Sequence, residues 1–310
     1  MRFKTVFLAS IIFLLVAVIF IAYLVPVISA DGILDWLTGK ATKPANVTIT
    51  VSQIQIPWVS TIINPQNVTE SDTTNVTFYF NASIPGGANT SINQSTATGN
   101  FSLAGQTTRT NTSCINVSNG ADWINFSCTV LVYYWDGVGT WTVGAYIKDN
   151  SGNGNSNTSI TMNLSTSTCF VVSPGNLTWA TVIPGATNQQ SNNDPTLMNN
   201  TCNKNITSGG VAVNATDLAG DTTPTYAILA ADFRSGIVDG TTCASGNALV
   251  NRSAVAITNA VLPPGNNSIN TFNETSGQEQ LYYCVPLVNA SLTAQTYSTS
   301  RLGQWNIQAV

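Results

Sequence analysis

The sequence predicts an all-β protein, in which two consecutive β-sandwich domains follow an N-terminal hydrophobic helix. Three observations lead to this prediction. Runs rich in Val, Ile, Thr, Tyr and Trp alternate with polar residues at period two, as strands with one buried face do. Few strong helix formers follow residue 30. Stretches rich in Asn, Gly, Pro and Thr separate the runs, and 310 residues suffice for two domains of ordinary size.

The hydrophobic helix is predicted at residues 6–27, where only two residues are polar. A run of roughly 20 apolar residues can span a bilayer, which favours a transmembrane anchor held in the membrane by this segment. The stretch from Pro26 to Ala30 instead resembles the end of a signal peptide, with cleavage before Asp31. Both interpretations of residues 1–30 stay open.

Charges on either side of the segment predict its orientation. Arg2 and Lys4 precede it, whereas Asp31 and Asp35 follow it. Because positive residues favour the cytoplasmic side, the rest of the chain is expected outside the membrane. Residues 31–45 are then a juxtamembrane linker, and the protein lies on the outer face of the membrane or, if cleaved, is secreted or held at the cell surface.

The first sandwich is predicted over residues 46–166. Alternation indicates strands at residues 47–51, 75–81, 124–134, 140–148 and 158–164. Gly137 and Gly139 lie between the third and fourth of these runs, which predicts that the two pair as a hairpin. Short strands at this spacing, separated by polar turns, are typical of an immunoglobulin-like (Ig-like) sandwich.

The second sandwich is predicted over residues 167–310, with a boundary near residues 165–169. Its expected strands are residues 178–183, 210–216, 281–287 and 304–309, while residues 226–233 fit a strand or a short helix. The two domains share one motif, Gly-x-Trp-x-(Val/Ile)-x-Ala, at Gly139–Ala145 and at Gly303–Ala309. Each copy is expected to turn its Trp toward a core.

Asn-x-Ser/Thr sequons are the strongest statistical signal in the chain. They start at 20 of the 35 Asn residues, whereas chance would give about eight among 70 Ser and Thr in 310 residues. Each is a candidate N-glycosylation site at an exposed position, although an Asn- and Thr-rich β-protein without sugar is the alternative. The candidate sites are Asn46, Asn67, Asn75, Asn81, Asn89, Asn93, Asn100, Asn111, Asn116, Asn125, Asn157, Asn163, Asn176, Asn199, Asn205, Asn214, Asn251, Asn266, Asn273 and Asn289.

All six cysteines follow the hydrophobic segment, and an even number in an exported chain predicts disulfides. Several connectivities are compatible with the sequence. We expect Cys114 to pair with Cys128, since both fall in the first domain. Nearest-neighbour pairing would then join Cys169 to Cys202 and Cys243 to Cys284.

Composition excludes most catalytic chemistry. The chain contains no His, no phosphate-binding Gly loop and no dinucleotide fingerprint, so no enzyme activity, small-molecule substrate or cofactor is expected. A net charge of −4 disfavours nucleic acid as a partner. Asp149 begins a loop that imitates an EF-hand and is a weak calcium candidate, but Ile160 occupies the position where a bidentate Glu is required. A polar turn is the simpler interpretation.

Sequon-free stretches suggest where partners could bind. No sequon starts between Asn125 and Asn157, between Asn214 and Asn251, or after Asn289. Because a glycan would disrupt a packed interface, these segments are candidate self-association or partner surfaces, or are simply core. Aromatic side chains can also act as platforms for sugars, and the candidates for such a role are Trp58, Trp123 and Trp179, although burial in a core is the simpler interpretation of each.

The segment Trp141–Asp149, followed by Gly152 and Asn153, is similar to the late strands of Ig-like domains in bacterial and archaeal surface proteins. Together with the hydrophobic segment and the sequons, the chain resembles archaeal cell-surface or secreted glycoproteins with tandem Ig-like domains. The resemblance implies a non-enzymatic structural or adhesive role. The alternatives are a secreted subunit of a pilus-like filament assembled by donor-strand addition and a carbohydrate-binding module.

Overall fold

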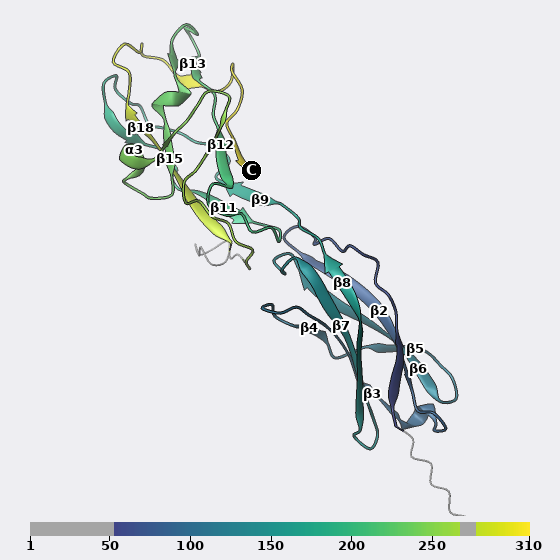
Figure 1. Ribbon diagram of the computed structural model, residues 1–310. Coiled ribbons are helices and arrows are strands. Elements are labelled where there is room, and N and C mark those ends of the chain that lie inside the picture. Colours follow the sequence, from purple (N-terminus) through teal and green to yellow (C-terminus); the bar gives the residue numbers. More distant parts are fainter. Residues whose placement is uncertain (1–52, 267–276) are drawn as a thin grey trace, which may run out of the picture. The chain divides into compact units, whose positions relative to one another are not determined.

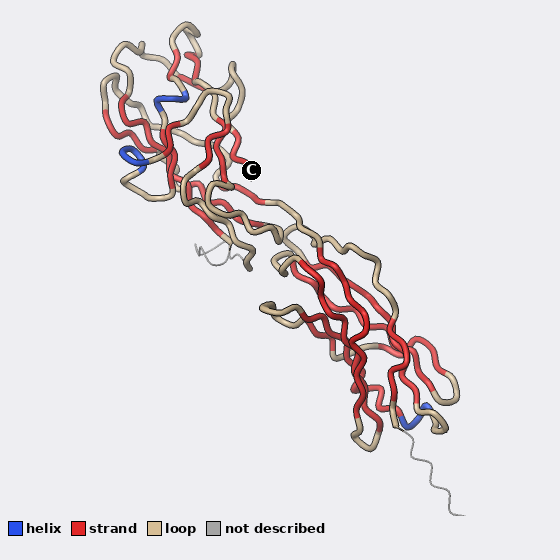
Figure 2. The backbone as a smooth tube through the Cα atoms, in the orientation of Figure 1, coloured by secondary structure: helices blue, strands red, loops and turns tan. Residues whose placement is uncertain are grey.

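The computed structural model describes residues 53–266 and 277–310, and its regular elements are almost all antiparallel strands (Figures 1 and 2). The helical elements are short: η2 (Asn89–Ser91), η3 (Ala230–Asp232) and α3 (Thr242–Ser245). The described residues belong to one compact unit. Across the two described ranges, no helix has both the length and the apolar character needed to cross a bilayer. The segment at 6–27 and the strand expected at 47–51 lie outside those ranges.

The first half of the described chain is a sandwich of two four-stranded sheets. One sheet has the order β1 (Gln55–Val59), β2 (Thr73–Ser83), β6 (Trp123–Tyr133), β5 (Ile115–Asn119). The other has the order β4 (Arg109–Asn111), β3 (Ile92–Ser102), β7 (Gly139–Asp149), β8 (Gly154–Leu164). In chain order these are the A-B-E-D and C′-C-F-G sheets of an Ig-like sandwich, which confirms the predicted fold class here.

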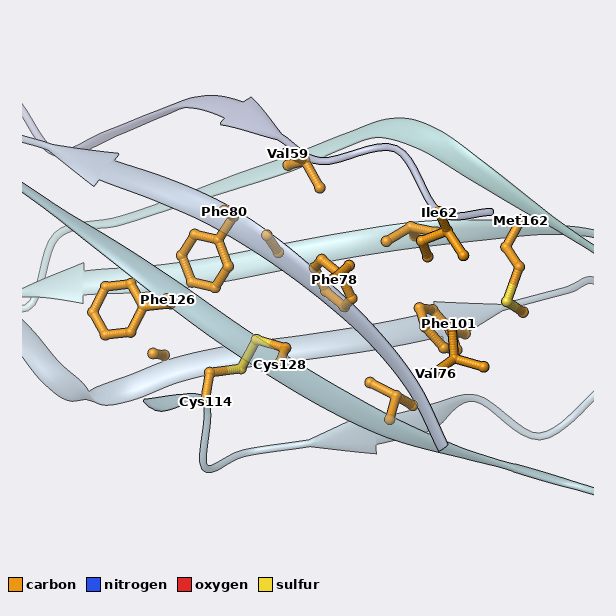
Figure 3. Packing of buried hydrophobic residues seen from close by; sticks show 14 of the residues in the cluster. Val59, Ile62, Val76, Phe78, Phe80, Phe101, Cys114, Phe126, Cys128 and Met162 are labelled. Atoms are coloured by element: carbon orange, nitrogen blue, oxygen red, sulfur yellow. A yellow bond between two sulfur atoms is a disulfide. The ribbon is translucent and has the colours of Figure 1, made fainter. Parts of the chain in front are cut away.

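The core of this sandwich comes from the inward positions of the long strands. On β2, residues Val76, Phe78 and Phe80 are buried while the residues between them are exposed. Phe126 of β6 stacks on Phe80 with ring centroids 5.1 Å apart, and Figure 3 shows both beside the other buried side chains. Trp141 of β7 is 1% exposed. Burial of each such side chain stabilises the fold by about 1.5–3 kcal/mol.

The predicted hairpin between residues 124–134 and 140–148 is wrong. Both strands exist, as β6 and β7, but β6 pairs with β2 and β5, whereas β7 pairs with β3 and β8. The connection therefore crosses from one sheet to the other. A short Gly-containing connection fits both arrangements, so the local sequence could not separate them.

The second half has shorter strands in three antiparallel sheets. The largest contains β16 (Asn247–Ala248), β15 (Arg234–Gly236), β18 (Gln278–Leu287), β11 (Thr196–Asn200) and β9 (Phe170–Ser173), with β10 (Thr187–Gln190) also paired to β18. A second joins β17 (Ala254–Ala256), β12 (Val211–Asn214) and β20 (Asn306–Ala309). The third joins β14 (Ala227–Ile228), β13 (Leu218–Gly220) and β19 (Tyr297–Ser298).

Phe233 lies at the centre of aromatic packing in the second core. It is 1% exposed and contacts Trp179 and Trp305 edge-on, with centroids 5.2 and 5.0 Å apart. Trp305 and Trp141 occupy the shared motif, and both donate their indole N–H to a backbone carbonyl. Each motif therefore places its Trp against a core, although Trp305 is only half-buried.

Residues 178–183 are not a strand, contrary to prediction. Their backbone is bonded by side chains instead of by a neighbouring strand, since Asn193 and Asn192 accept hydrogen bonds from the N–H groups of Thr178 and Ala180, both at 3.0 Å. The ambiguous segment 226–233 divides into β14 and η3.

Candidate glycan-bearing and interaction surfaces

The sequon Asn side chains differ in exposure. The exposed ones are Asn67, Asn75, Asn116, Asn163, Asn176, Asn205, Asn251, Asn266 and Asn289. The half-buried ones are Asn81, Asn89, Asn93, Asn100, Asn111, Asn125, Asn157 and Asn214. Asn199 is buried, while Asn46 and Asn273 lie outside the described residues. Exposure therefore separates sequons that an enzyme could reach on the folded chain from those that it could not.

The atom that would carry an N-linked sugar, the amide nitrogen Nδ2, already makes a hydrogen bond at several sequons. Asn81 Nδ2 donates to Asn125 Oδ1 at 2.8 Å, and Asn125 Nδ2 donates to Ser118 Oγ at 3.2 Å. The amides of Asn111 and Asn157 donate to the backbone carbonyls of other strands at 2.7 and 2.9 Å. A sugar on any of these nitrogens would have to displace or share a contact that links strands.

Asn199 is the sequon least compatible with sugar. It lies on β11, is 6% exposed, and accepts a hydrogen bond from Gln278 Nε2 at 2.8 Å. The residues that follow it, Asn200, Thr201, Cys202 and Asn203, are buried as well. A glycan attached to Asn199 would have no room in this arrangement.

Three disulfides form, and they are the three pairs that the sequence favours: Cys114–Cys128, Cys169–Cys202 and Cys243–Cys284. The first joins β6 to the residue before β5, so it lies within one sheet and does not link the two sheets. The third connects α3 to β18, the central strand of the largest sheet in the second half. Disulfides of this number are typical of proteins exposed to an oxidising, extracellular environment.

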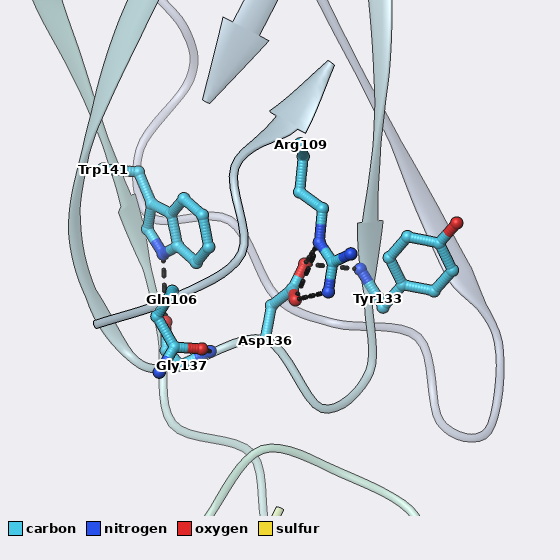
Figure 4. Close-up of polar contacts among 6 residues, drawn as sticks. All are labelled: Gln106, Arg109, Tyr133, Asp136, Gly137 and Trp141. Atoms are coloured by element: carbon cyan, nitrogen blue, oxygen red, sulfur yellow. Dashed lines mark hydrogen bonds and ion pairs between the residues drawn. The ribbon is translucent and has the colours of Figure 1, made fainter. Parts of the chain in front are cut away.

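A buried ion pair shapes the connection between β6 and β7. Arg109 Nε lies 3.0 Å from both carboxylate oxygens of Asp136, and Figure 4 shows the guanidinium facing that carboxylate. Asp136 is 1% exposed and also accepts the N–H of Tyr133 at 2.8 Å, while the Arg109 guanidinium carbon lies 4.3 Å from the Tyr133 ring centroid. This pair ties β4 to the corner where the chain changes sheets, and it serves structure, since its polar atoms are turned inward.

The calcium candidate Asp149 caps its own turn. Its Oδ1 accepts the N–H groups of Ser151 and Asn153, both at 2.9 Å, and its Oδ2 accepts Asn153 Nδ2 at 2.9 Å. The hydrogen bond from the Asn153 side chain lowers the pKa of Asp149. In the described part of the chain, no three acidic, Cys or His side chains are grouped to hold a metal ion.

The three Trp residues considered as sugar platforms have different environments. Trp58 on β1 is 50% exposed. Trp123, at the start of β6, is half-buried. Trp179 packs on Phe233 and donates its indole N–H to the Gln189 carbonyl at 3.1 Å, so it belongs to the core. Trp58 alone of the three presents half of its surface to solvent.

The sequon-free stretches are partly core and partly exposed. Between Asn125 and Asn157, β7 is a central strand with buried Trp141, so packing explains much of the first stretch, in which Leu131 and Val138 are each 43% exposed. The second stretch, residues 215–250, carries several exposed apolar side chains beside buried Phe233. They are Tyr226 (40%), Leu229 (50%), Val238 (54%) and Val250 (50%). This second stretch is therefore the stronger candidate interface.

The second core also contains a group of buried polar atoms. Asp194 lies between β10 and β11, which both pair with β18. Its Oδ2 accepts a hydrogen bond from the N–H of Tyr283 at 2.9 Å. Burial raises the pKa of Asp194 to about 6, and nearby Asp239 adds to the shift. Burial likewise raises the pKa of the Tyr283 hydroxyl, which lies close to Thr196 and Ser235. Sequence analysis gave no signal for this group, because its members are distant in the chain.

No family model and no curated protein sequence matches this chain. Among solved structures, the partial N-terminal region of an enterococcal surface protein aligns with 81% of this chain and 88% of its own length, at 10% identity and a TM-score of 0.17. A TM-score of this size supports no conclusion about fold or function.

Proposed function

We propose that this chain is a non-enzymatic, heavily N-glycosylated structural or adhesion protein of the cell surface, of the kind found in archaea. The observation that carries the proposal is the excess of sequons, many of them at exposed positions of a disulfide-bonded β-fold. Sugars would supply the solubility that a charged fraction of only 8% does not. The absence of His from the sequence favours a non-catalytic role.

Protease treatment of intact cells tests the location. The proposal expects the chain to be degraded on intact cells while a cytoplasmic control protein survives. The mature N-terminus then separates the two interpretations of residues 1–30. Mass spectrometry that finds Asp31 as the first residue indicates a secreted form, and an intact N-terminal segment in the membrane fraction indicates an anchor. Protection of the chain until the cells are lysed would contradict the proposal.

A filament subunit is the second candidate function, because β5 offers an edge for strand addition. All five residues of β5 are exposed, and the strand pairs with β6 alone among the described strands. An incoming strand from another copy, such as residues 46–52, could pair with that edge. We expect Ile115→Lys to abolish filaments in electron micrographs if assembly uses β5, because a charged edge resists pairing. Unchanged filaments would exclude this edge.

A further inference from the structure

The strands of the sheet β1–β2–β6–β5, of which Figure 1 labels β2, β6 and β5, carry no charged side chain of their own. None of the residues in these four strands, all of which are described, is Asp, Glu, Lys or Arg. Its polar groups are hydroxyls and amides, and cross-strand pairs such as Thr77 with Thr129 bond one another at 2.7 Å. Such a surface suits a neutral, hydroxyl-rich partner and gives no electrostatic complement to an acidic or basic one.

Large apolar side chains lie among these polar groups. Tyr79 is 45% exposed and Leu131 is 43% exposed, while Ile115 and Trp58 at the edge strands are 63% and 50% exposed. Tyr79 and Ile115 lie on opposite sides of Ser127 in the sheet register. Exposed apolar groups gathered on one face of a soluble domain usually mark a surface that something covers.

The sequon at Asn75 lies on this same face. Asn75 is directly opposite Leu131 in the β2–β6 register, and Thr77 and Tyr79 follow it at alternate positions that point the same way. Asn75 is exposed, and nothing within the described ranges accepts a hydrogen bond from its amide. By contrast, the amides of Asn81 and Asn125 further along the face are bonded to neighbouring strands. Asn75 is thus the attachment point on β2 that is geometrically free.

We propose that the N-glycan carried by Asn75 folds back along β2 and packs on Leu131 and Tyr79, covering this face of the protein. The inference rests on the proposed glycosylation and adds to it the place where one glycan lies. The C–H faces of pyranose rings are apolar and pack on aromatic and aliphatic side chains, while sugar hydroxyls bond to Thr77 and Thr129. Tyr79 lies four residues, about 13 Å, along the strand from the attachment point, so a glycan of a few sugars reaches it.

Covalent attachment also favours the Asn75 glycan over a free oligosaccharide as the group that covers this face. A tethered sugar is present at high effective concentration, so weak stacking contacts suffice to hold it. Contact with the ring removes apolar surface from water, which is the source of the stabilisation. Trp58 lies on the neighbouring strand β1 opposite Asn81, six residues or about 20 Å along β2 from Asn75, so only a longer glycan would reach it.

Oxidative footprinting of the full-length chain, secreted by an N-glycosylating host, tests the proposal. Mass spectrometry of the same samples reports sugar occupancy at each sequon. We expect Tyr79 and Leu131 to oxidise at least about twofold faster in Asn75→Gln than in the wild type, because the covering sugar is gone. Asn163→Gln is the matched control, since Asn163 is an exposed sequon residue on β8 of the other sheet. That variant should leave Tyr79 unchanged.

A second variant keeps the sugar and removes its platform. Tyr79→Ser should speed enzymatic release of the Asn75 glycan without altering release from Asn163, because the glycan is then less protected. Equal oxidation of Tyr79 with and without sugar at Asn75 would overturn the inference. So would an Asn75 without sugar in a chain whose other sequons carry it. In both cases, sugar at other sequons would leave the proposed function supported. Absence of sugar from every sequon would overturn both.

A free oligosaccharide adds one more decisive result. If neutral hexose oligomers bind to Asn75→Gln but not to the wild type, the face recognises sugar and its own glycan already occupies it. Equal binding to both would contradict the proposal, since it would show that the face is open to external glycans.

Discussion

The two halves of the described chain are stabilised by different kinds of contact. In the first half, five strands have 11 residues each, and their backbone groups bond one another in long ladders over an aromatic core. In the second half, β18 has 10 residues and the other strands have two to five. Side chains such as Gln295, which accepts the N–H groups of both Thr222 and Thr223, replace the missing ladder bonds. The first half therefore depends on sheet pairing and packing, and the second on specific side chains and disulfides.

The largest expected contrast is between the two Trp residues of the shared motif. Trp141→Ala should destabilise the protein by about 3–5 kcal/mol, because it empties a site that is 1% exposed. Trp305→Ala should cost less, about 1–3 kcal/mol, because Trp305 is only half-buried. Chemical denaturation of each variant checks the order, and equal losses would contradict the proposed difference between the two cores.

Disulfide removal should affect the second half more than the first. The Cys243–Cys284 pair closes a loop of 41 residues and Cys114–Cys128 one of 14. Loop entropy predicts a difference of about 1 kcal/mol within typical losses of about 2–4 kcal/mol. We expect the double Ala replacement of Cys243 and Cys284 to lower the denaturation midpoint more than that of Cys114 and Cys128. If removing Cys114–Cys128 lowered the midpoint more, loop length would not account for the stabilisation that these disulfides provide.

Side-chain bonds to the backbone should matter in the second half. Asn193→Ala removes Oδ1, the atom that accepts hydrogen bonds from both the Thr178 N–H and the Ser191 hydroxyl, and we expect a loss of about 1–2 kcal/mol. Thr77→Val, which removes one exposed cross-strand hydroxyl bond from the first half, should change stability by less than about 0.5 kcal/mol. Urea titration of both variants compares them directly. A larger loss for Thr77→Val would contradict the account.

A further expected effect is a pH dependence of stability from Asp194. Its pKa is about 6 in the folded protein against an ordinary 3.8, so the folded state binds more protons than the unfolded state between these values. The stabilisation from this group is complete below the ordinary pKa and is lost as pH rises through 6. Asp194→Asn should remove that decline while keeping an acceptor for the Tyr283 N–H. If the free energy of unfolding declined equally between pH 4 and 6 in the variant and the wild type, within about 0.3 kcal/mol, Asp194 would be excluded as the source of the decline.

Local pattern was sufficient to predict four of the five 11-residue strands, but it did not predict how the strands pair. Period-two alternation at β6 and β7 is visible in the sequence, and so is the sequon excess. The β6–β7 connection was predicted wrongly because it depends on strand partners elsewhere in the chain, β2 and β5 for β6 and β3 and β8 for β7. β3, from Ile92 to Ser102, escaped prediction because Ala97 and Gly99 occupy inward positions where a larger apolar residue would have marked a strand.

The candidate sites divide in the same way. Sequon positions and cysteine pairs follow from spacing, and the three disulfides confirm the expected pairing. Which Asn side chains are accessible depends on the fold, since Asn75 and Asn199 have the same local motif but opposite exposure. The platform formed by Tyr79 and Leu131 arises from strand register, which residues 52 positions apart in the chain cannot reveal by themselves.

Site-resolved glycopeptide mass spectrometry of the protein from its own cell surface tests the central claim most directly. The account predicts sugar at exposed sequons whose amide nitrogen makes no hydrogen bond to a described residue, such as Asn67, Asn75, Asn163 and Asn289, and none at buried Asn199. A chain without sugar at any of the exposed positions, or one with Asn199 fully occupied, would contradict it.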